Sequence, residues 1–376
     1  MKFVFAPDSF KGSLSAQRII KILDNQAHLI FGDCTCVGIP MADGGEGTLD
    51  IIHNICNGKY VQLEVSDPLF QPISSRYSVL DNGAVLIEMA AASGLPLVPI
   101  EKRNPEFTTT FGTGQLIKAA LDAGHKQFII GVGGSATNDG GIGAMAALGV
   151  RFLDNSGHEL SPIGGNLIHI RTIDTSHIHP ALQSSSFRVM CDIDNPLLGD
   201  RGATIVFAPQ KGATATQLIR LEEGMAHYVS MLKAQLGVDP SNIPGAGAAG
   251  GLAAGLMAFL NASLHSGIST VLSLSQFSSV IQDADYCITG EGRADSQSAH
   301  GKVLWGVGTT CEEYNIPVIA IVGCLGSGYE ELFKCGIKKI YTTIEDGMSV
   351  EYAMQHAEEQ LNKAAAKMFS DIKDRR

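Results

Sequence analysis

Residues 128–143 combine the features expected of an anion-binding turn. An apolar run at 128–130 predicts a buried strand, and Ala144–Leu148 predicts a helix that ends near Gly149. Between them lie glycines, small hydroxyl residues and an Asn-Asp pair. Backbone N–H groups at a turn without side chains, ahead of a helix N-terminus, attract phosphate. The candidate contacts in this turn are Gly133, Gly134, Ser135, Thr137, Asn138 and Asp139.

Two other interpretations of the same turn remain open. The pattern Gly131-x-Gly133-x-x-Ala136, with Asp154 about 20 residues further on, formally matches a dinucleotide-binding fingerprint. The glycines could also serve only to let a helix pack closely on a sheet. Because the turn holds more glycines than close packing requires, together with Asn138 and Asp139, a phosphate or substrate-hydroxyl loop is the preferred interpretation.

Charged residues follow several other predicted strands. Asp8 and Lys11 come after an apolar strand at residues 2–6, and Asp43 follows a strand at residues 35–39. The carboxyl ends of strands in open α/β sheets are where ligands bind. The alternative is that Asp8 caps a turn and that Lys11 is solvated. Glu46 has a purely structural explanation, because an acid in the first helical turn complements the helix dipole.

A second group of charges lies in the later part of the chain. Asp192 and Asp194 follow a strand at residues 187–191, and strand alternation would put both on one side, as a divalent-cation site or a general base requires. The alternative is an ordinary Asp-Asn-Pro turn. Arg293 and Lys302 are the cations best placed for a carboxylate or phosphate, although either could be a solvated charge.

Composition limits the classes of function. The 376 residues are enough for two domains with their own cores, and 43 glycines with only 17% charged residues suit an α/β enzyme with many glycine turns. The formal net charge is −11, and the basic residues are scattered. This balance argues against a nucleic-acid-binding surface.

The cysteines and the apolar stretches indicate a cytoplasmic protein. None of the eight cysteines forms C-x-x-C and the histidines show no metal-ligand spacing, so we expect reduced thiols without a zinc site or a disulfide framework. No export signal opens the chain. Residues 240–282 lack Asp, Glu, Lys and Arg, but the polar residues among them favour a buried helical segment over a membrane span.

The order of elements predicts two α/β regions. Residues 1–75 and 265–376 alternate strands with helices, as parallel sheets do, whereas the middle of the chain mixes hairpins and helices. Neither a Walker A sequence nor the protein-kinase H-R-D and D-F-G motifs occur. The glycine turns, acids and lone cations together indicate phosphoryl transfer to a small polar acceptor.

Five ordered blocks then carry a resemblance to a known family. The blocks are APDSFKG (6–12), PMADGGEGT (40–48), GGSATNDGG (133–141), CDIDNPL (191–197) and TGEGRAD (289–295). Together they resemble the glycerate kinase type I family over essentially the whole chain. One small departure from the family pattern is Ala294, where a larger residue is expected between Arg293 and Asp295. We infer no functional difference from it.

The resemblance implies ATP-dependent phosphorylation of D-glycerate on its 2-hydroxyl, with Mg²⁺. It also implies a discontinuous Rossmann-like domain (1–75 and 265–376) with a mixed-sheet α/β domain (76–264) inserted in it, and an active site in the cleft between them. The expected partners are ATP and D-glycerate, with neither nucleic acid nor membrane, and the chain would be a monomer or a homodimer.

The mechanistic hypothesis assigns roles to these residues. Loops at 133–141 and 290–292 would hold the ATP phosphates, and Lys11 or Arg293 would pair with the glycerate carboxylate. Asp8, Asp43 or Asp192 would orient the attacking hydroxyl. The predicted cofactor contacts outside the 133–141 loop are Gly290, Glu291, Gly292 and Lys302, and the predicted metal ligands are Asp192, Asp194 and Asp295.

Two rival functions stay open. One is a nicotinamide-dependent 2-hydroxyacid dehydrogenase, suggested by the glycine fingerprint alone. The other is a non-catalytic sensor of sugar acids, which would bind its ligand without consuming ATP.

Overall fold

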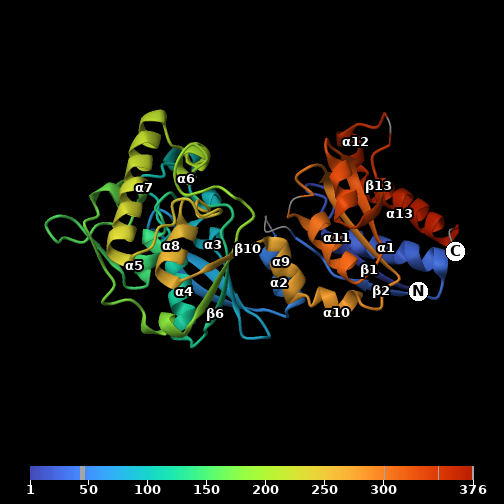
Figure 1. Ribbon diagram of the computed structural model, residues 1–376, viewed down its shortest axis with the longest axis horizontal. Coiled ribbons are helices and arrows are strands. Elements are labelled where there is room, and N and C mark those ends of the chain that lie inside the picture. The colour runs from blue at the N-terminus through green and yellow to red at the C-terminus, as the bar shows by residue number, and fades with distance from the viewer. Residues whose placement is uncertain (43–46, 300, 346, 375–376) are drawn as a thin grey trace. The chain divides into compact units, whose positions relative to one another are not determined.

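The chain folds into two compact α/β units. A computed structural model describes residues 1–42, 47–299, 301–345 and 347–374. Unit 1 comprises residues 1–55 and 266–376, and unit 2 comprises residues 56–265. Both ends of the chain, blue and red in Figure 1, therefore belong to unit 1, whereas unit 2 is one continuous segment. The expected α/β class, with one parallel and one mixed sheet, is confirmed.

Unit 1 is built on a parallel sheet of five strands. Their order is β13-β12-β11-β1-β2, so β1 lies between β11 and β2. Strands β1 and β12 are mostly apolar and buried, as expected where both faces of a parallel sheet are covered. The five strands are β1 (Lys2–Pro7), β2 (Thr35–Gly38), β11 (Tyr286–Ala294), β12 (Val318–Leu325) and β13 (Ile337–Thr342).

Helices α1 and α13 pack together in unit 1. Ser15 caps α1 (Ala16–Phe31), since its Oγ accepts a hydrogen bond from the N–H of Arg18 at 3.2 Å, and Gly32 ends the helix with φ of +68°. The apolar face of α1 meets that of α13 (Ala357–Asp374), where Phe369 packs edge-on against Phe3 of β1. The other helices of the unit are α2 (Thr48–Ile55), α9 (Gly267–Leu274), α10 (Phe277–Ile281), α11 (Val303–Glu313) and α12 (Val350–Gln355), with a 3-10 segment at Tyr329–Cys335.

Unit 2 contains the mixed sheet. Its order is β10-β9-β6-β5-β4-β3; β3, β4 and β5 are antiparallel neighbours, and the remaining pairs are parallel. These strands are β3 (Lys59–Ser66), β4 (Pro72–Val79), β5 (Val85–Glu88), β6 (Gln127–Gly131), β9 (Ser186–Met190) and β10 (Ser263–His265). A small separate hairpin pairs β7 (Arg151–Leu153) with β8 (Thr172–Asp174).

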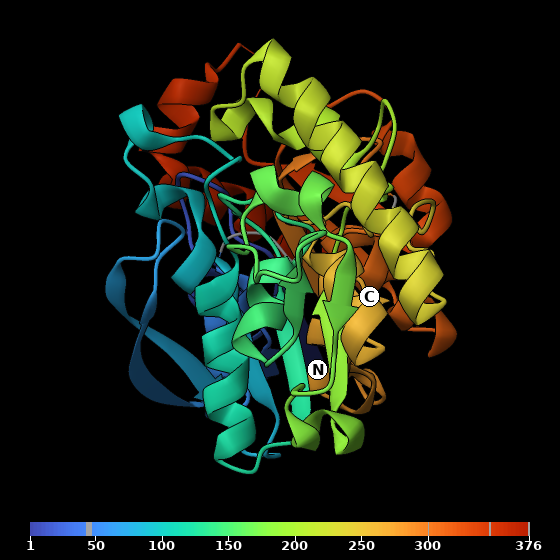
Figure 2. The same cartoon turned by 90° about the vertical axis from the view of Figure 1, so that its left-hand side faces the viewer.

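Several helices complete unit 2, of which the yellow α7 (Ala215–Leu236) is the longest (Figures 1 and 2). It begins at a capping box formed by Thr214 and Gln217. The others are α3 (Ala90–Ser93), α4 (Phe111–Asp122), α5 (Ile142–Ala147), α6 (Ala203–Phe207) and α8 (Leu252–Leu260). The 3-10 segments are Leu95–Leu97, Ile100–Lys102, Gly164–His169, Pro180–Ser184 and Pro209–Lys211.

The first boundary between the units differs from the expected one. It lies between Ile55 and Cys56 rather than after residue 75, because β3 pairs along its whole length with β4, from Lys59 opposite Val79 to Ser66 opposite Pro72. Residues 56–75 therefore belong to the mixed sheet. The second boundary, between His265 and Ser266, lies within one residue of expectation.

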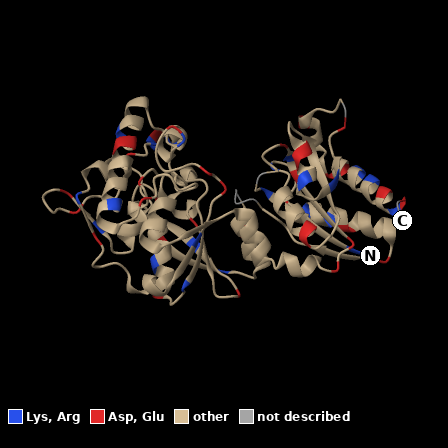
Figure 3. Ribbon diagram, viewed as in Figure 1, with Lys and Arg blue, Asp and Glu red and all other residues tan. Residues whose placement is uncertain are grey.

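The uncharged stretch at residues 240–282 supplies α8 to unit 2 and α9 and α10 to unit 1. These helices carry no coloured charge in Figure 3. Leu252, Leu256 and Ile268 are fully buried, which accounts for the apolar composition. Among the described residues, no helix has the length and apolar character needed to cross a membrane.

Candidate active site

A pocket of about 420 Å³ opens at the carboxyl end of the unit 1 sheet. The loop after β1, the ends of β11 and β12, and the N-terminus of α11 all contribute to it, as the rule for open α/β sheets predicts. The pocket brings together seven of the predicted site residues. They are Asp8, Lys11, Glu291, Gly292, Arg293, Asp295 and Lys302.

Asp8 is fixed where β1 ends. Its backbone N–H donates to the carbonyl of Gly290 at 2.8 Å, which extends the pairing between β1 and β11 by one residue. The Oδ1 atom of Asp8 accepts a hydrogen bond from the N–H of Ser9 at 2.6 Å, and the residue is 7% exposed. Asp8 thus combines a turn-capping contact with a position on the pocket wall.

Arg293 and Asp295 are adjacent on the last part of β11 and the loop that follows it. Arg293 Nε lies 3.5 Å from Asp295 Oδ2, and the Arg293 side chain is 65% exposed, so its guanidinium remains available to an anion. The Oδ1 atom of Asp295 accepts the N–H of Gln297 at 3.0 Å. Lys302 Nζ donates to the side-chain oxygen of Gln297 at 3.3 Å. Gln297 therefore contacts both Asp295 and Lys302.

The glycines of β11 have different roles. A Cβ on Gly290 would lie 2.1 Å from the carbonyl oxygen of Ile321, so close approach of β11 and β12 requires glycine there. Gly290 is buried within the sheet and does not line the pocket, whereas Gly292 does. Packing in the sheet therefore explains Gly290, and Gly292 is the better candidate for contact with a ligand.

The pocket also has an apolar part. Ile344, Val350, Ala353 and Met354 line it, and they come from the segment after β13 and from α12. The pocket lining thus combines charged residues with apolar side chains. The predicted site residue Asp43 lies outside the described residues.

In unit 2, the predicted glycine loop connects β6 to α5. Gly133 and Gly134 are exposed, and Gly134 has φ of +71°. Ser135 pairs with Gly94, and the N–H of Ala136 donates to the carbonyl of Ser93 at 2.9 Å, so the loop is tied to the segment after α3. The exposed part of the loop, which can present backbone N–H groups to a ligand, is therefore Gly133 and Gly134.

Asp139 lies beneath this loop and is fully buried. Its Oδ2 atom accepts from the N–H and Oγ1 of Thr110 at 2.7 and 2.8 Å and from the N–H of Gly143 at 3.2 Å, while Oδ1 accepts from the N–H of Gly141 at 3.1 Å. Burial raises the pKa of the Asp139 carboxyl, and these four donors act in the opposite direction. The carboxylate thus joins the starts of α4 and α5, a structural role in place of the expected contact with a ligand.

Thr137 and Asn138 are also fully buried. The side-chain Nδ2 of Asn138 donates to Thr204 Oγ1 at 3.1 Å, and Thr137 Oγ1 donates to the carbonyl of Ala249 at 3.4 Å. A Cβ on Gly250 would lie 2.0 Å from the carbonyl oxygen of Thr137, so a second glycine-rich segment packs directly on this part of the loop. Both side chains support the loop from the interior of unit 2.

Lys211 completes this support, and the sequence analysis did not identify it. It is 2% exposed, and its Nζ donates to Ser135 Oγ at 2.8 Å and to the carbonyl of Thr137 at 2.6 Å. Burial lowers the pKa of Lys211 from 10.5 to about 7, and the charge of Asp139 opposes this shift. In the sequence, Lys211 is marked only by its position before Gly212 and after an apolar run. This pattern is too common to predict that a lysine is buried.

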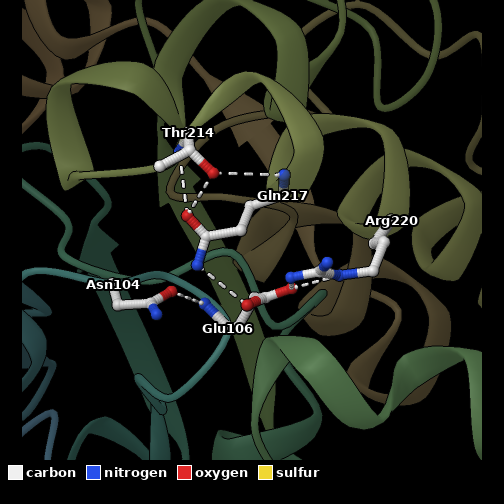
Figure 4. A network of polar contacts seen from close by, with 5 residues as sticks. All are labelled: Asn104, Glu106, Thr214, Gln217 and Arg220. Carbon is white, nitrogen blue, oxygen red and sulfur yellow. Dashed lines mark hydrogen bonds and ion pairs between the residues drawn. The ribbon is translucent and has the colours of Figure 1, made fainter.

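A network of polar contacts lies next to the segment that precedes Thr108 and Thr110 (Figure 4). Glu106 accepts from Gln217 Nε2 at 2.8 Å and from Arg220 Nε at 2.9 Å, and its own N–H donates to Asn104 Oδ1 at 3.0 Å. Since Gln217 also belongs to the capping box with Thr214, the network joins the start of α7 to residues 104–106, just before the threonines that contact the glycine loop.

Asp192 and Asp194 lie on the loop after β9. Because β9 ends at Met190, strand alternation does not extend to these residues and does not place them on one side. Both oxygens of Asp194 are within 2.9 Å of Arg201 Nη2, and this guanidinium lowers the pKa of the carboxyl. Asp192 is exposed. The predicted metal ligands are thus divided between unit 2 (Asp192 and Asp194) and the unit 1 pocket (Asp295).

The dinucleotide interpretation of the glycine loop does not fit this geometry. The fingerprint requires the helix to open within the glycine motif, whereas α5 begins only at Ile142, after a loop of ten residues. Asp154, the expected ribose-binding acid, uses Oδ1 to accept the N–H groups of Ser156 and His158 in the turn after β7. Its structural role is that of a turn residue.

Comparison with known proteins gives a consistent result over the whole chain. A model of the glycerate kinase family matches residues 3–373. A protein named glycerate kinase from Bacillus subtilis (strain 168) is 45% identical over 374 residues, which cover 99% of this chain and 98% of the relative. A glycerate 2-kinase from Escherichia coli (strain K12) is 43% identical over 373 residues, with 99% and 98% covered.

The fold agrees with a solved structure of the same type. A crystal structure described as "putative glycerate kinase 2 from Salmonella typhimurium LT2" superposes with a TM-score of 0.88 at 40% sequence identity. The superposition covers 100% of this chain and 98% of the other.

Proposed function

This chain belongs to the glycerate kinase family and is a kinase, and from that premise we propose that it phosphorylates D-glycerate with ATP on the 2-hydroxyl, giving 2-phosphoglycerate and ADP. The dehydrogenase and sensor alternatives are set aside, because the relatives matched over their full length are kinases.

The observation that carries the proposal is the charge pattern of the unit 1 pocket. Three cationic side chains, Lys11, Arg293 and Lys302, line one pocket together with carboxylates. Glycerate and the ATP phosphates are all anionic, so binding them requires cations in reach. The fork of the Arg293 guanidinium suits a carboxylate or two phosphate oxygens, and the ammonium groups of the lysines suit single oxygens.

The reaction needs a group that orients and deprotonates the attacking alcohol. The 2-hydroxyl oxygen attacks the γ-phosphorus, the bond from that phosphorus to the bridging oxygen of ADP breaks, and the hydroxyl proton passes to a carboxylate. Asp8, Asp43 and Asp192 are the candidates for this carboxylate. Asp8 already lines the pocket, with Oδ1 held by the N–H of Ser9.

The oxygen donors of the pocket also suit Mg²⁺, which prefers carboxylates and phosphate oxygens. Asp295 lines the pocket, and Asp192 and Asp194 are the other proposed ligands. When bound, Mg²⁺ would neutralise charge on the phosphates. The residues of the chain then position the alcohol and the transferred group, and this placement accounts for most of the rate in phosphoryl transfer.

In unit 2, the proposed contact with ATP phosphates is the backbone of residues 133 and 134. Gly133 and Gly134 have no side chain that would keep a phosphate away from their N–H groups, and both are exposed. Asp139 and Lys211 act on this contact indirectly, because their hydrogen bonds hold the loop from below. We further propose that the protein acts in the cytoplasm, as a monomer or a homodimer.

Release of ADP on addition of D-glycerate to the protein, ATP and Mg²⁺ tests the proposal. The phosphorus NMR spectrum of the product distinguishes phosphorylation of the 2-hydroxyl from that of the 3-hydroxyl. ADP release that does not depend on D-glycerate would refute the substrate assignment, and a 3-phosphorylated product would refute the regiochemistry. Arg151→Ala is the control for pocket variants, since Arg151 lies on β7 and pairs with Glu159 at the surface of unit 2.

A further inference from the structure

Three potential metal ligands meet at the amino end of the unit 1 sheet. His28 lies in the last turn of α1, which ends at Gly32, and Cys34 and Cys36 follow at the start of β2. Thr35 pairs with Lys2, the first residue of β1, whereas the pocket opens after Pro7 at the other end of that strand. The group is therefore separate from the candidate active site.

The ligand atoms of His28, Cys34 and Cys36 lie within 4.8 Å of one another, and no other set of three or more His, Cys, Asp or Glu does so among the residues described. Cys34 Sγ is 3.9 Å from Cys36 Sγ, and Cys36 Sγ is 4.0 Å from His28 Nδ1. In a tetrahedral zinc site, Zn–S bonds of about 2.3 Å place two sulfurs about 3.8 Å apart. The observed separations are thus close to those of a metal site.

Short sequence separations bring these atoms together. Cys34 comes directly before β2 and Cys36 lies within it, and their Sγ atoms are 3.9 Å apart. Asp24 and His28 are four apart on α1 and share one face, with His28 Nδ1 3.4 Å from Asp24 Oδ1. Asp24 is thus a further oxygen donor beside the three ligands.

The electrostatics of the group also favour a cation. Two thiols and a carboxylate would repel one another if ionised, and a divalent cation removes that repulsion because it binds thiolates directly. His28 Nδ1 lies 2.9 Å from the carbonyl oxygen of Asp24. If Nδ1 binds the metal, the metal bond replaces this contact with the carbonyl.

We propose that His28, Cys34 and Cys36 form a binding site for a thiophilic divalent cation, Zn²⁺ in the first instance, with the fourth position open to water or to the nearby Asp24. Imidazole and thiolate donors select Zn²⁺ over Mg²⁺ or Ca²⁺. The bound ion would join the end of α1 to the edge strand β2, and so would stabilise unit 1 without taking part in phosphoryl transfer.

The test uses the full chain, prepared with a reductant that is then removed. Zn²⁺ affinity is measured by competition with a chromophoric chelator, and Co²⁺ is added separately as a spectroscopic probe. We expect one tight Zn²⁺ site and, with Co²⁺, the thiolate charge-transfer and visible bands of a four-coordinate ion. The Cys34→Ser/Cys36→Ser variant should bind Zn²⁺ about 10²-fold more weakly or worse. The Cys56→Ser/Cys191→Ser variant, which removes two thiols from unit 2, should bind as the parent does.

A second measurement does not depend on any variant folding. Bound Zn²⁺ should protect Cys34 and Cys36 from alkylation in the parent protein, while the rate at Cys56 stays the same. Equal Zn²⁺ affinity in the two double variants, or equal alkylation with and without Zn²⁺, would overturn the proposal. A Cys34–Cys36 disulfide that forms readily in air, together with no Zn²⁺ binding by the reduced protein, would overturn it as well.

Discussion

The buried Lys211 should make the stability of unit 2 depend on pH. Its pKa is about 7 in the folded chain, against 10.5 for an ordinary lysine. Above about pH 7 the unfolded chain keeps this proton while the folded chain loses it, so the free energy of unfolding rises with pH. The cost of burying the charge is complete below that pH and is progressively relieved above it.

The size of the effect follows from the shift. Between about pH 7 and pH 9, this one group should add about 2 kcal/mol to the free energy of unfolding. For a unit of this size the change corresponds to a rise in Tm of about 4–9 °C. Lys211→Met should abolish this contribution, because the variant has no proton to exchange at the site.

The assay is calorimetric unfolding of the full chain at a series of pH values. Trp305, the only tryptophan, lies in unit 1, so its fluorescence identifies the transition of that unit and leaves the other transition to unit 2. Lys233→Met is the matched control, since Lys233 is 68% exposed and pairs with Asp239 on the surface of unit 2. If the parent and Lys211→Met have the same pH slope, the buried-charge argument is refuted.

Three further substitutions test the assigned roles. Asp139→Asn should destabilise unit 2 by about 2–4 kcal/mol, because an amide N–H₂ would face the N–H of Gly141; an unchanged calorimetric transition would contradict this. Arg293→Ala should lower kcat/KM by about 10²-fold through loss of an anion contact, whereas Arg151→Ala should keep parental steady-state kinetics. Asp192→Asn should lower turnover by about 10²-fold or more if Asp192 is the base, and ordinary turnover would remove that assignment.

Much of the fold could be predicted because the signals are local. Apolar runs located β1 and β6. The unit to which residues 56–75 belong was predicted wrongly, because β3 is mostly exposed and its sequence does not specify which sheet it joins.

The site residues that come directly after strands could be predicted from the sequence. Lys11, Arg293 and Lys302 share a pocket because parallel strands bring their carboxyl ends to one edge of the sheet. The roles of Asp139 and Lys211 depend on burial and on partners far away in sequence; Lys211 and Ser135 are 76 residues apart. No spacing rule connects such residues, so only the folded structure identifies them.

The discontinuity of unit 1 has a consequence for biosynthesis. While the nascent chain leaves the ribosome, β1 emerges first, yet its neighbour β11 is translated only after all of unit 2. The continuous segment 56–265 can therefore mature early, whereas the apolar strand at the N-terminus must wait with one edge unpaired. This interval, when unit 1 lacks most of its sheet, is when the growing polypeptide is most exposed to aggregation and most dependent on chaperones.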